Sequence, residues 1–287
     1  MNKTNLFIVG TAKSGTTSFH NYLHQHPNIS MSEIKETNFF SFDEIEKNNL
    51  YYNDNSVKSE KLYLNLFRNS NDEKYLGESS VSYLFYESVP QRLFDYNPDA
   101  KILIFLRNPA HRAFSHYLMD YSAGYFNYSF EEIIQNEGIP KQVYQQIVSL
   151  GMYANQVKRY YTLFGKEQVK IILFEEASLN LLETLKEIES FLKLSNYDKY
   201  DKTKRNIFLG SGKGIIFALY RSQQIKKILK LLLPKRITDK FKSTFLRGTR
   251  KPVMNEENRN FLKKIYSKNI EETSSIIGRD LKTLWSK

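Results

Sequence analysis

A short apolar run followed by a glycine-flanked turn, close to the start of the chain, most constrains the fold. Residues 6–9 (LFIV) have the pattern of a strand buried on both faces. A turn of small residues lies between Gly10 and Gly15, and Thr16 opens a segment with the apolar spacing of a helix. This order predicts an anion-binding loop, because free N–H groups at a helix N-terminus and the helix dipole attract negative charge.

The side chains of this turn also suit an anion. Lys13 adds a positive charge, and Thr16 and Thr17 add hydroxyl donors. The common nucleoside triphosphate loop reads G-x-x-x-x-G-K-[ST], whereas here the lysine precedes the second glycine. A solvated lysine in an ordinary strand-to-helix turn is the alternative. The coincidence of glycines, lysine and hydroxyl groups after a buried strand favours the anion site.

Strand and helix patterns alternate along the 287 residues. This alternation predicts a single α/β domain over residues 1–287, with a central parallel sheet flanked by helices, of the P-loop nucleotide-binding type. Strands are expected at 6–9, 29–31, 75–79, 101–106 and 169–174. Beyond the first one, helices are expected at 89–96, 110–121, 130–135, 152–164, 179–192 and 256–276.

The composition narrows the chemistry. The chain has 42 Lys plus Arg against 31 Asp plus Glu, a net charge of +11, which suits an anionic ligand, nucleic acid or a membrane surface. It has no cysteine, which excludes disulfides, thiolate metal sites and a cysteine nucleophile. The start does not have the pattern of a signal peptide, and there is no apolar run of about 18 residues, so we expect a cytoplasmic protein.

One apolar segment with lysines, residues 215–233, admits two interpretations. As a basic amphipathic helix it would make a peripheral contact with a membrane. As a helix packed on the core it would carry its lysines on the solvated face. The second interpretation is the favoured one.

A second group of candidate residues follows the apolar strand at 101–106. Arg107 ends this strand, and Ser115 comes eight residues later in a helical segment. Ligands bind at the carboxyl ends of strands in open α/β sheets, and a guanidinium there offers a forked donor to a phosphate. Taken alone, Arg107 is better explained by pairing with a carboxylate.

A third group is the segment KETNFF at 35–40. Glu36 follows the short strand predicted at 29–31, which would bring its carboxylate near the first loop. A carboxylate in that place suits a general base that takes a proton from a hydroxyl group. The alternative is a solvated Lys35–Glu36 pair, the usual place of charged residues.

Together these three segments resemble the sulfotransferases that use 3′-phosphoadenosine 5′-phosphosulfate (PAPS). KSGTT at 13–17 is similar to their 5′-phosphosulfate loop, and the segment from Arg107 to Ser115 is similar to their 3′-phosphate segment. KETNFF at 35–40 is similar to the Glu-x-x-Phe-Phe segment of glycan sulfotransferases. The resemblance covers about residues 5–121 and continues weakly to the end of the chain.

The resemblance implies a role for each group. Glu36 would be the general base, and Lys13 would stabilise the leaving 3′-phosphoadenosine 5′-phosphate (PAP). Arg107 and Ser115 would bind the 3′-phosphate of PAPS. No metal is expected. The phosphosulfate would be held by the loop residues Thr11, Ala12, Lys13, Ser14, Gly15, Thr16, Thr17 and Ser18.

The acceptor is less sharply defined. The resemblance implies a hydroxylated acceptor, first a glycan, and second a lipid-linked or small hydroxylated metabolite. Ser79 stands where many glycan sulfotransferases have a lysine, and Ser41 where one branch often has an acidic residue, so the match is to the broad family. Four aromatic residues are expected to wall the cleft: Phe39, Phe40, Tyr83 and Phe85.

Two further features of the sequence concern the nucleotide site and the catalytic base. The family closes the nucleotide site with a late basic loop, for which 204–214 and 247–251 are the two candidates. Among the histidines, His20 is expected to cap or to lie at the surface, and His111 and His116 are poor candidates for a catalytic base.

Two other functions compete with this interpretation. A P-loop kinase would need an acidic magnesium ligand, and none is apparent in the sequence. A nucleic-acid-binding protein would use the net charge, but the charge is spread along the chain without a recognised reader motif, so no specific nucleic acid partner is expected.

Overall fold

The computed structural model describes residues 3–51, 57–201 and 252–286. Three segments considered above lie outside the described residues: 204–214, 215–233 and 247–251.

A five-stranded parallel sheet in the order β2-β3-β1-β4-β5 forms the centre of the molecule. The central strand pairs on one side with β3, where Leu6 lies opposite Gly77, and on the other with β4, where Leu6 lies opposite Lys101. This confirms the predicted α/β fold with a parallel sheet. The strands are β1 (Leu6–Gly10), β2 (Ile29–Met31), β3 (Tyr75–Ser79), β4 (Lys101–Leu106) and β5 (Val169–Leu173).

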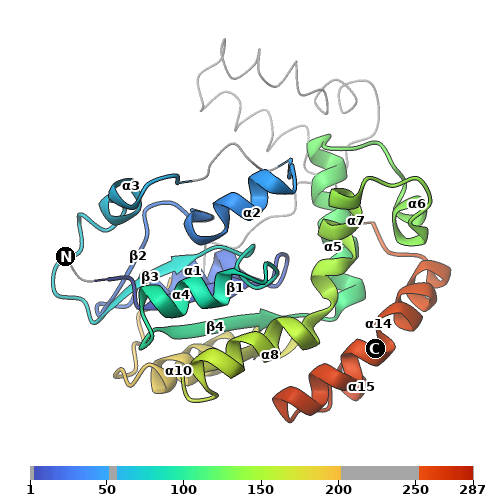
Figure 1. Cartoon of the computed structure of the whole chain (residues 1–287). Helices are drawn as coiled ribbons and strands as arrows, with labels where there is room; N and C mark the ends of the chain where they lie inside the picture. Colours follow the sequence, from blue (N-terminus) through green and yellow to red (C-terminus); the bar gives the residue numbers. More distant parts are fainter. Residues whose placement is uncertain (1–2, 52–56, 202–251, 287) are drawn as a thin grey trace.

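Helices cover both faces of the sheet (Figure 1). Successive side chains of a strand point to opposite faces, so Phe7 and Ile8 belong to two different apolar clusters. Phe7 packs in the cluster that includes α4 (Val89–Tyr96) and α8 (Tyr153–Phe164). Ile8 packs in the cluster that includes α1 (Thr16–Leu23) and α10 (Leu181–Phe191).

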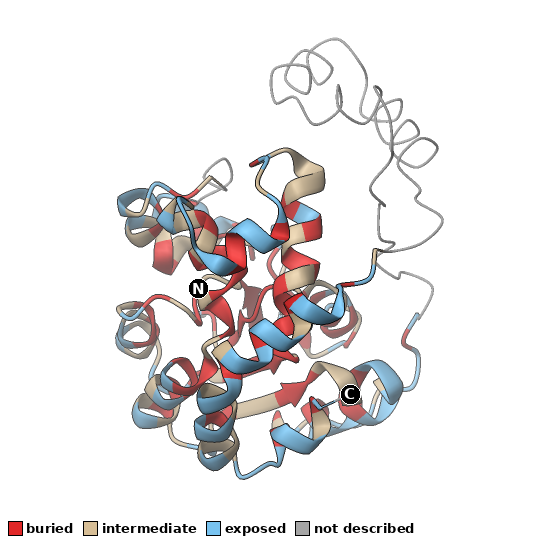
Figure 2. Cartoon of the chain, turned by 90° about the vertical axis from the view of Figure 1, so that its right-hand side faces the viewer, coloured by how far each residue is buried: buried red, intermediate tan, exposed pale blue. Residues whose placement is uncertain are grey.

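A third apolar cluster involves the helices that follow β4. It is centred on α5 (Pro109–Ala123), which leaves the carboxyl end of the sheet (Figure 1). Figure 2 shows the buried residues on the strands and on the inner sides of the helices around them. The other helices of this cluster are α6 (Phe130–Gln135), α7 (Lys141–Ile147) and α14 (Glu256–Ile277).

Short helices complete the described chain. The strand-to-helix turn after β4 is well capped, since the Asn108 side chain accepts hydrogen bonds from the N–H groups of Ala110 and His111 and Pro109 occupies the first turn of α5. The short elements are η1 (Phe39–Ser41), α2 (Phe42–Lys47), α3 (Glu60–Asn65), η3 (Ser149–Gly151), α9 (Phe174–Leu179) and α15 (Leu281–Leu284).

Candidate active site

The loop between β1 and α1 has the geometry of an anion cradle. Lys13 and Gly15 adopt left-handed backbone conformations, with φ of 69° and 85°. The hydroxyl oxygens of Thr11 and Ser14 are buried and have no hydrogen-bond partner among the described residues. Because a buried hydroxyl without a partner is costly, these two groups suit a ligand that brings oxygen atoms into the loop.

The aromatic ring of Phe174 packs against both this loop and Arg107. A Cβ atom on Gly15 would lie 3.2 Å from Cδ2 of Phe174, so a larger residue would crowd this ring. The guanidinium carbon of Arg107 lies 4.5 Å from the centroid of the same ring. The Phe174 side chain therefore packs against both the glycine of the loop and the cation of the next strand end.

Arg107 binds the loop directly. Its Nη1 donates a hydrogen bond of 2.8 Å to the backbone carbonyl of Lys13. Because β1 and β4 are adjacent, the segments that follow them leave the sheet side by side. Burial lowers the pKa of Arg107, although the guanidinium remains cationic at neutral pH. Two of the predicted phosphate-binding residues thus meet, while Ser115 lies nearly buried on α5.

The end of the chain supports the Arg107 segment. Glu175 accepts hydrogen bonds from the Asn108 N–H, at 2.9 Å, and from Nε1 of Trp285, at 3.1 Å. The Asn108 side chain donates in turn to the Trp285 carbonyl, at 2.9 Å. The hydroxyl of Tyr153 donates to the carbonyl of Arg107 itself, at 2.9 Å. No motif of the sequence indicates a role for Glu175 or Trp285.

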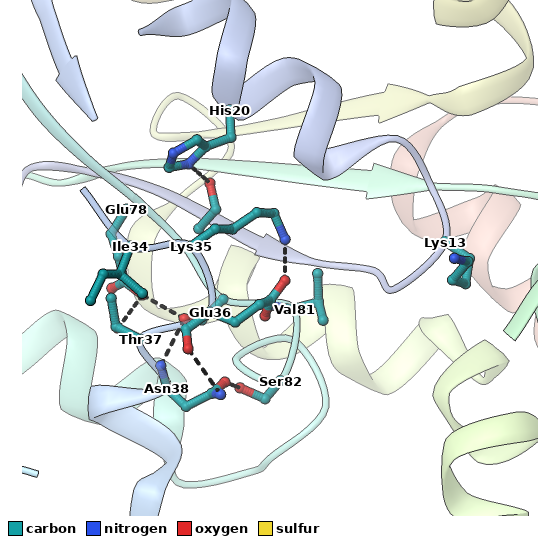
Figure 3. A network of polar contacts seen from close by, with 12 residues as sticks. Lys13, His20, Ile34, Lys35, Glu36, Thr37, Asn38, Glu78, Val81 and Ser82 are labelled. Atoms are coloured by element: carbon teal, nitrogen blue, oxygen red, sulfur yellow. Dashed lines mark hydrogen bonds and ion pairs between the residues drawn. The ribbon is translucent and has the colours of Figure 1, made fainter. Parts of the chain in front are cut away.

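Glu36 lies on the other side of the loop, beyond β3. Its backbone N–H donates to the carbonyl of Ser79 at 2.8 Å, and its φ of 61° is in the left-handed region. The Val81 N–H donates to Oε2 at 2.9 Å, and the Lys35 ammonium contacts Oε1. Each carboxylate oxygen keeps a lone pair for a further donor. In Figure 3, Lys13 lies apart from this network, so Lys35 is the cation that holds Glu36.

A second carboxylate fixes the segment that carries Glu36. Glu78, at the end of β3, is fully buried and accepts from Thr37 at 2.6 Å. It also accepts hydrogen bonds from the hydroxyls of Ser80, Tyr63 and Tyr83. Burial raises the pKa of Glu78, and these hydroxyl donors oppose the rise. No motif of the sequence singles out Glu78, and its place at the end of the strand predicted at 75–79 is the only signal that could have indicated it.

His20 differs from its expected place at the surface. It is buried on α1, and its Nδ1 lies 2.9 Å from the Ser79 hydroxyl (Figure 3). Burial, together with the nearby charge of Lys35, lowers the pKa of His20 to about 4. It is therefore a neutral packing residue beneath the site.

A cavity of about 420 Å³ connects the loop with Glu36, since both Ala12 and Glu36 line it. Phe85 lines it, as expected of a wall residue. The same expectation is wrong for Phe39, Phe40 and Tyr83, which do not line this cavity. They pack in the aromatic core instead, because Thr37 and Tyr83 both donate hydrogen bonds to the buried Glu78. There Phe39 stacks on Tyr63 at 4.5 Å and Phe40 contacts Tyr83 edge to face at 5.8 Å.

His116 also lines this cavity, from α5. Its Nδ1 lies 3.1 Å from Nη1 of Arg112, so it accepts there, and its Nε2 lies 3.5 Å from Oδ2 of Asp120. Burial and the Arg112 charge hold the pKa of His116 well below its usual value. Both ring nitrogens face protein groups, which makes His116 a neutral wall residue rather than a base.

Within 3–51, 57–201 and 252–286, no three or more histidine, aspartate or glutamate side chains gather in a way that would hold a metal ion. In the same part of the chain, none of the helices combines the length and the apolar character needed to span a bilayer.

Known proteins resemble this chain in sequence over most of its length. A model of the sulfotransferase domain family matches residues 3–274. The bifunctional heparan sulfate N-deacetylase/N-sulfotransferase of Drosophila melanogaster is 27% identical over an alignment of 243 residues, which covers 72% of this chain and 23% of that protein. Its human relative, the bifunctional heparan sulfate N-deacetylase/N-sulfotransferase 2, is 28% identical over 69% of this chain and 23% of its own length. The chain thus spans about a quarter of these relatives.

Solved structures of sulfotransferases have the same fold. The crystal structure of a sulfotransferase from Alicyclobacillus acidocaldarius covers 100% of both chains, with a TM-score of 0.74 and 31% sequence identity. Mouse sulfotransferase SULT7A1, solved in complex with PAP, covers 94% of this chain and 84% of its own, with a TM-score of 0.51 and 14% identity. At that identity, the second likeness shows the fold alone.

Proposed function

The chain belongs to the sulfotransferase domain family, and we propose that this enzyme moves the sulfuryl group of PAPS to a hydroxyl group of an acceptor. The observation that carries the proposal is the convergence of three segments on one site. Arg107 binds the carbonyl of Lys13, and the cavity beside this loop reaches Glu36. Lys13 and Arg107 suit a nucleotide that carries a phosphate group at each end, and the cavity suits the acceptor.

In the proposed reaction each of these residues has a separate role. The acceptor hydroxyl oxygen attacks sulfur, its proton passes to Glu36, and the bond between sulfur and the bridging oxygen of the 5′-phosphate breaks. Lys13 and the N–H groups at the start of α1 stabilise the negative charge that develops on the departing PAP. Arg107 and Ser115 bind the 3′-phosphate and hold the nucleotide in register.

The fit of the loop to the phosphosulfate supports this assignment. The unpaired buried hydroxyls of Thr11 and Ser14 offer donors inside the cradle. Lys13 and Glu36, the two residues with proposed chemical roles, both have φ values that non-glycine residues rarely adopt. Such conformations persist only when surrounding contacts over-determine them, and they cluster at functional sites.

A carbohydrate hydroxyl is the acceptor class proposed first, because relatives over about 70% of this chain are named for heparan sulfate. A lipid-linked or small hydroxylated metabolite comes second. The test is incubation with PAPS and a mixture of acceptors, followed by mass spectrometry for sulfated products and chromatography for PAP. We expect both products to accumulate together. Transfer from ATP instead, with none from PAPS, would refute the proposal in favour of a kinase.

A further inference from the structure

The walls of the acceptor cavity restrict what it can hold. Most of its described lining is apolar or aromatic, from several segments that follow Glu36 in the sequence. These wall residues are Ile45, Leu50, Tyr51, Phe85, Tyr86, Met119, Tyr125 and Leu150.

The aromatic walls occur in two pairs. The rings of Tyr51 and Tyr125 are 5.0 Å apart, and those of Phe85 and Tyr86 are 5.4 Å apart. Ring pairs of this kind offer flat apolar faces, which pack against hydrocarbon and against the C–H faces of sugars. Removing such surface from water is the main source of binding free energy that this cavity offers to an acceptor.

Charge is scarce in the same lining. Among the described lining residues there is no lysine or arginine. Glu36 brings a negative charge, and the low pKa of His116 keeps its imidazole neutral. Three described cations near the cavity have partners of their own. Lys35 contacts Glu36, and Arg112 donates to the carbonyls of Gln146 and Ile147. The Lys13 ammonium lies 3.3 Å from Sδ of Met119. At the described lining, an acceptor dense in carboxylates would meet the Glu36 carboxylate and no lysine or arginine side chain.

Apart from Glu36, the described polar groups that line the cavity are neutral. Asn38 and Ser82 line it and are joined by a hydrogen bond of 2.7 Å from the serine hydroxyl to the amide oxygen. Gln146 adds another amide. Amides and hydroxyls pair well with hydroxyl groups, and they lie on the same cavity as the proposed base.

From these walls we infer that the acceptor is an uncharged molecule that carries its hydroxyl on an apolar or aromatic body, such as a glycoside with a hydrophobic aglycone, rather than a polyanionic glycan. This inference rests on the proposed function, because it assumes that Glu36 faces the acceptor. It narrows the carbohydrate class to neutral sugars with an apolar neighbour. A cavity of about 420 Å³ accommodates a ligand of that size.

The test compares acceptors that differ in one property. Octyl glucoside below its micelle concentration and 4-nitrophenyl glucoside share their sugar hydroxyls with methyl glucoside but add an apolar body, whereas heparosan oligosaccharides add carboxylates. Binding to the PAP-loaded protein is measured by calorimetry, and turnover is measured with PAPS. We expect at least tenfold tighter binding of one of the two hydrophobic glucosides than of methyl glucoside, and no turnover of heparosan.

The outcomes are distinguishable. Equal binding of all three glucosides, or preferred turnover of heparosan, would overturn the inference and leave the sulfotransferase proposal standing. A protein that does not bind PAP at all would overturn the proposed function itself.

A wall variant adds a second measurement. Phe85→Ala removes a ring from the cavity and is expected to raise KM for the bound hydrophobic glucoside about tenfold, with kcat and PAP binding nearly unchanged. Phe85→Leu should restore most of the affinity. Phe261→Ala is the matched control, because Phe261 lies on α14, is 39% exposed and does not line the cavity. An unchanged KM in Phe85→Ala would contradict the wall assignment.

Discussion

Single side chains carry the proposed chemistry, and Glu36 is the one with the clearest surroundings. Two donors, the Val81 N–H and the Lys35 ammonium, fix its carboxylate at the edge of the cavity. This arrangement orients the carboxylate but leaves lone pairs for an acceptor hydroxyl. The sequence indicated Glu36 through its neighbours in KETNFF, and only the fold shows that Lys35 rather than Lys13 contacts it.

Glu36→Gln tests the base. The amide has nearly the same shape but takes up no proton, so kcat should fall about 10²- to 10⁴-fold. Calorimetry should find PAP affinity close to that of the wild type, because Glu36 is placed on the acceptor side. A variant with wild-type kcat would remove Glu36 from the mechanism.

Lys13→Ala tests the electrophilic side of the same reaction. The leaving phosphate loses its ammonium, so kcat should fall by a comparable factor, about 10²-fold or more. PAP binding should also weaken, unlike in Glu36→Gln, because Lys13 lies in the nucleotide loop. Full PAP affinity together with full turnover would show that Lys13 only fills the turn.

Glu78→Gln tests the buried carboxyl group that fixes the segment carrying Glu36. Since burial raises the pKa of Glu78, the folded protein keeps a proton that the unfolded chain releases near pH 4.5. The stability that this carboxyl contributes is therefore present at low pH and lost as pH rises through its folded pKa. The difference in unfolding free energy, wild type minus Glu78→Gln, should shrink as pH rises in denaturant titrations. A difference that grows with pH would contradict the raised pKa.

At the scale of elements, strand adjacency explains why distant motifs meet. Arg107 follows β4 and Lys13 follows β1, and these strands are hydrogen-bonded neighbours. Glu36 follows β2, which β3 separates from β1, so two strand spacings, about 10 Å, lie between the strands that carry Glu36 and Lys13. That separation leaves room for the acceptor cavity beside the loop.

Sequence patterns predicted the elements whose signals are local. The strands at 75–79 and 101–106 and the helices at 89–96 and 130–135 have the expected bounds, since apolar spacing and caps determine them. Helix α7 was not expected, because its buried polar residues depend on tertiary partners. There Gln145 lies 3.4 Å from the Tyr86 hydroxyl, and Arg112 donates to the Gln146 carbonyl. Dependence on tertiary partners also explains why Phe39, Phe40 and Tyr83 pack in the core and not in the cavity wall.

Trp285→Phe tests the support that α15 gives to the nucleotide side. The change keeps a ring but removes the N–H that Glu175 accepts, a charge-assisted bond of about 1.5–3 kcal/mol. Because Glu175 also accepts from the Asn108 N–H, the segment of Arg107 should loosen and PAP affinity should fall severalfold. A control variant, Phe261→Ala on the exposed side of α14, should bind PAP normally. Unchanged PAP affinity in Trp285→Phe would show that α15 does not support the nucleotide site.

At the scale of the whole molecule, two buried neutral histidines link stability to pH. Burial lowers the pKa of His20 to about 4 and holds that of His116 well below 6.5. Their contribution to stability is complete above pH 6.5 and is lost as pH falls, because the unfolded chain then binds protons that the folded state does not. We expect the unfolding free energy to fall between about pH 6.5 and 4, and His20→Asn to flatten part of that fall. An unchanged slope in the variant would contradict the burial of a neutral His20.

The central claim is that one site binds a nucleotide at both of its phosphate ends. Calorimetry of PAP against AMP, in the wild type and in Arg107→Ala, tests it most directly, because the two nucleotides differ by the 3′-phosphate alone. The account predicts that the wild type binds PAP at least tenfold more tightly than AMP, and that Arg107→Ala removes most of this preference while it still binds AMP. Equal affinity of the wild type for PAP and AMP would contradict it.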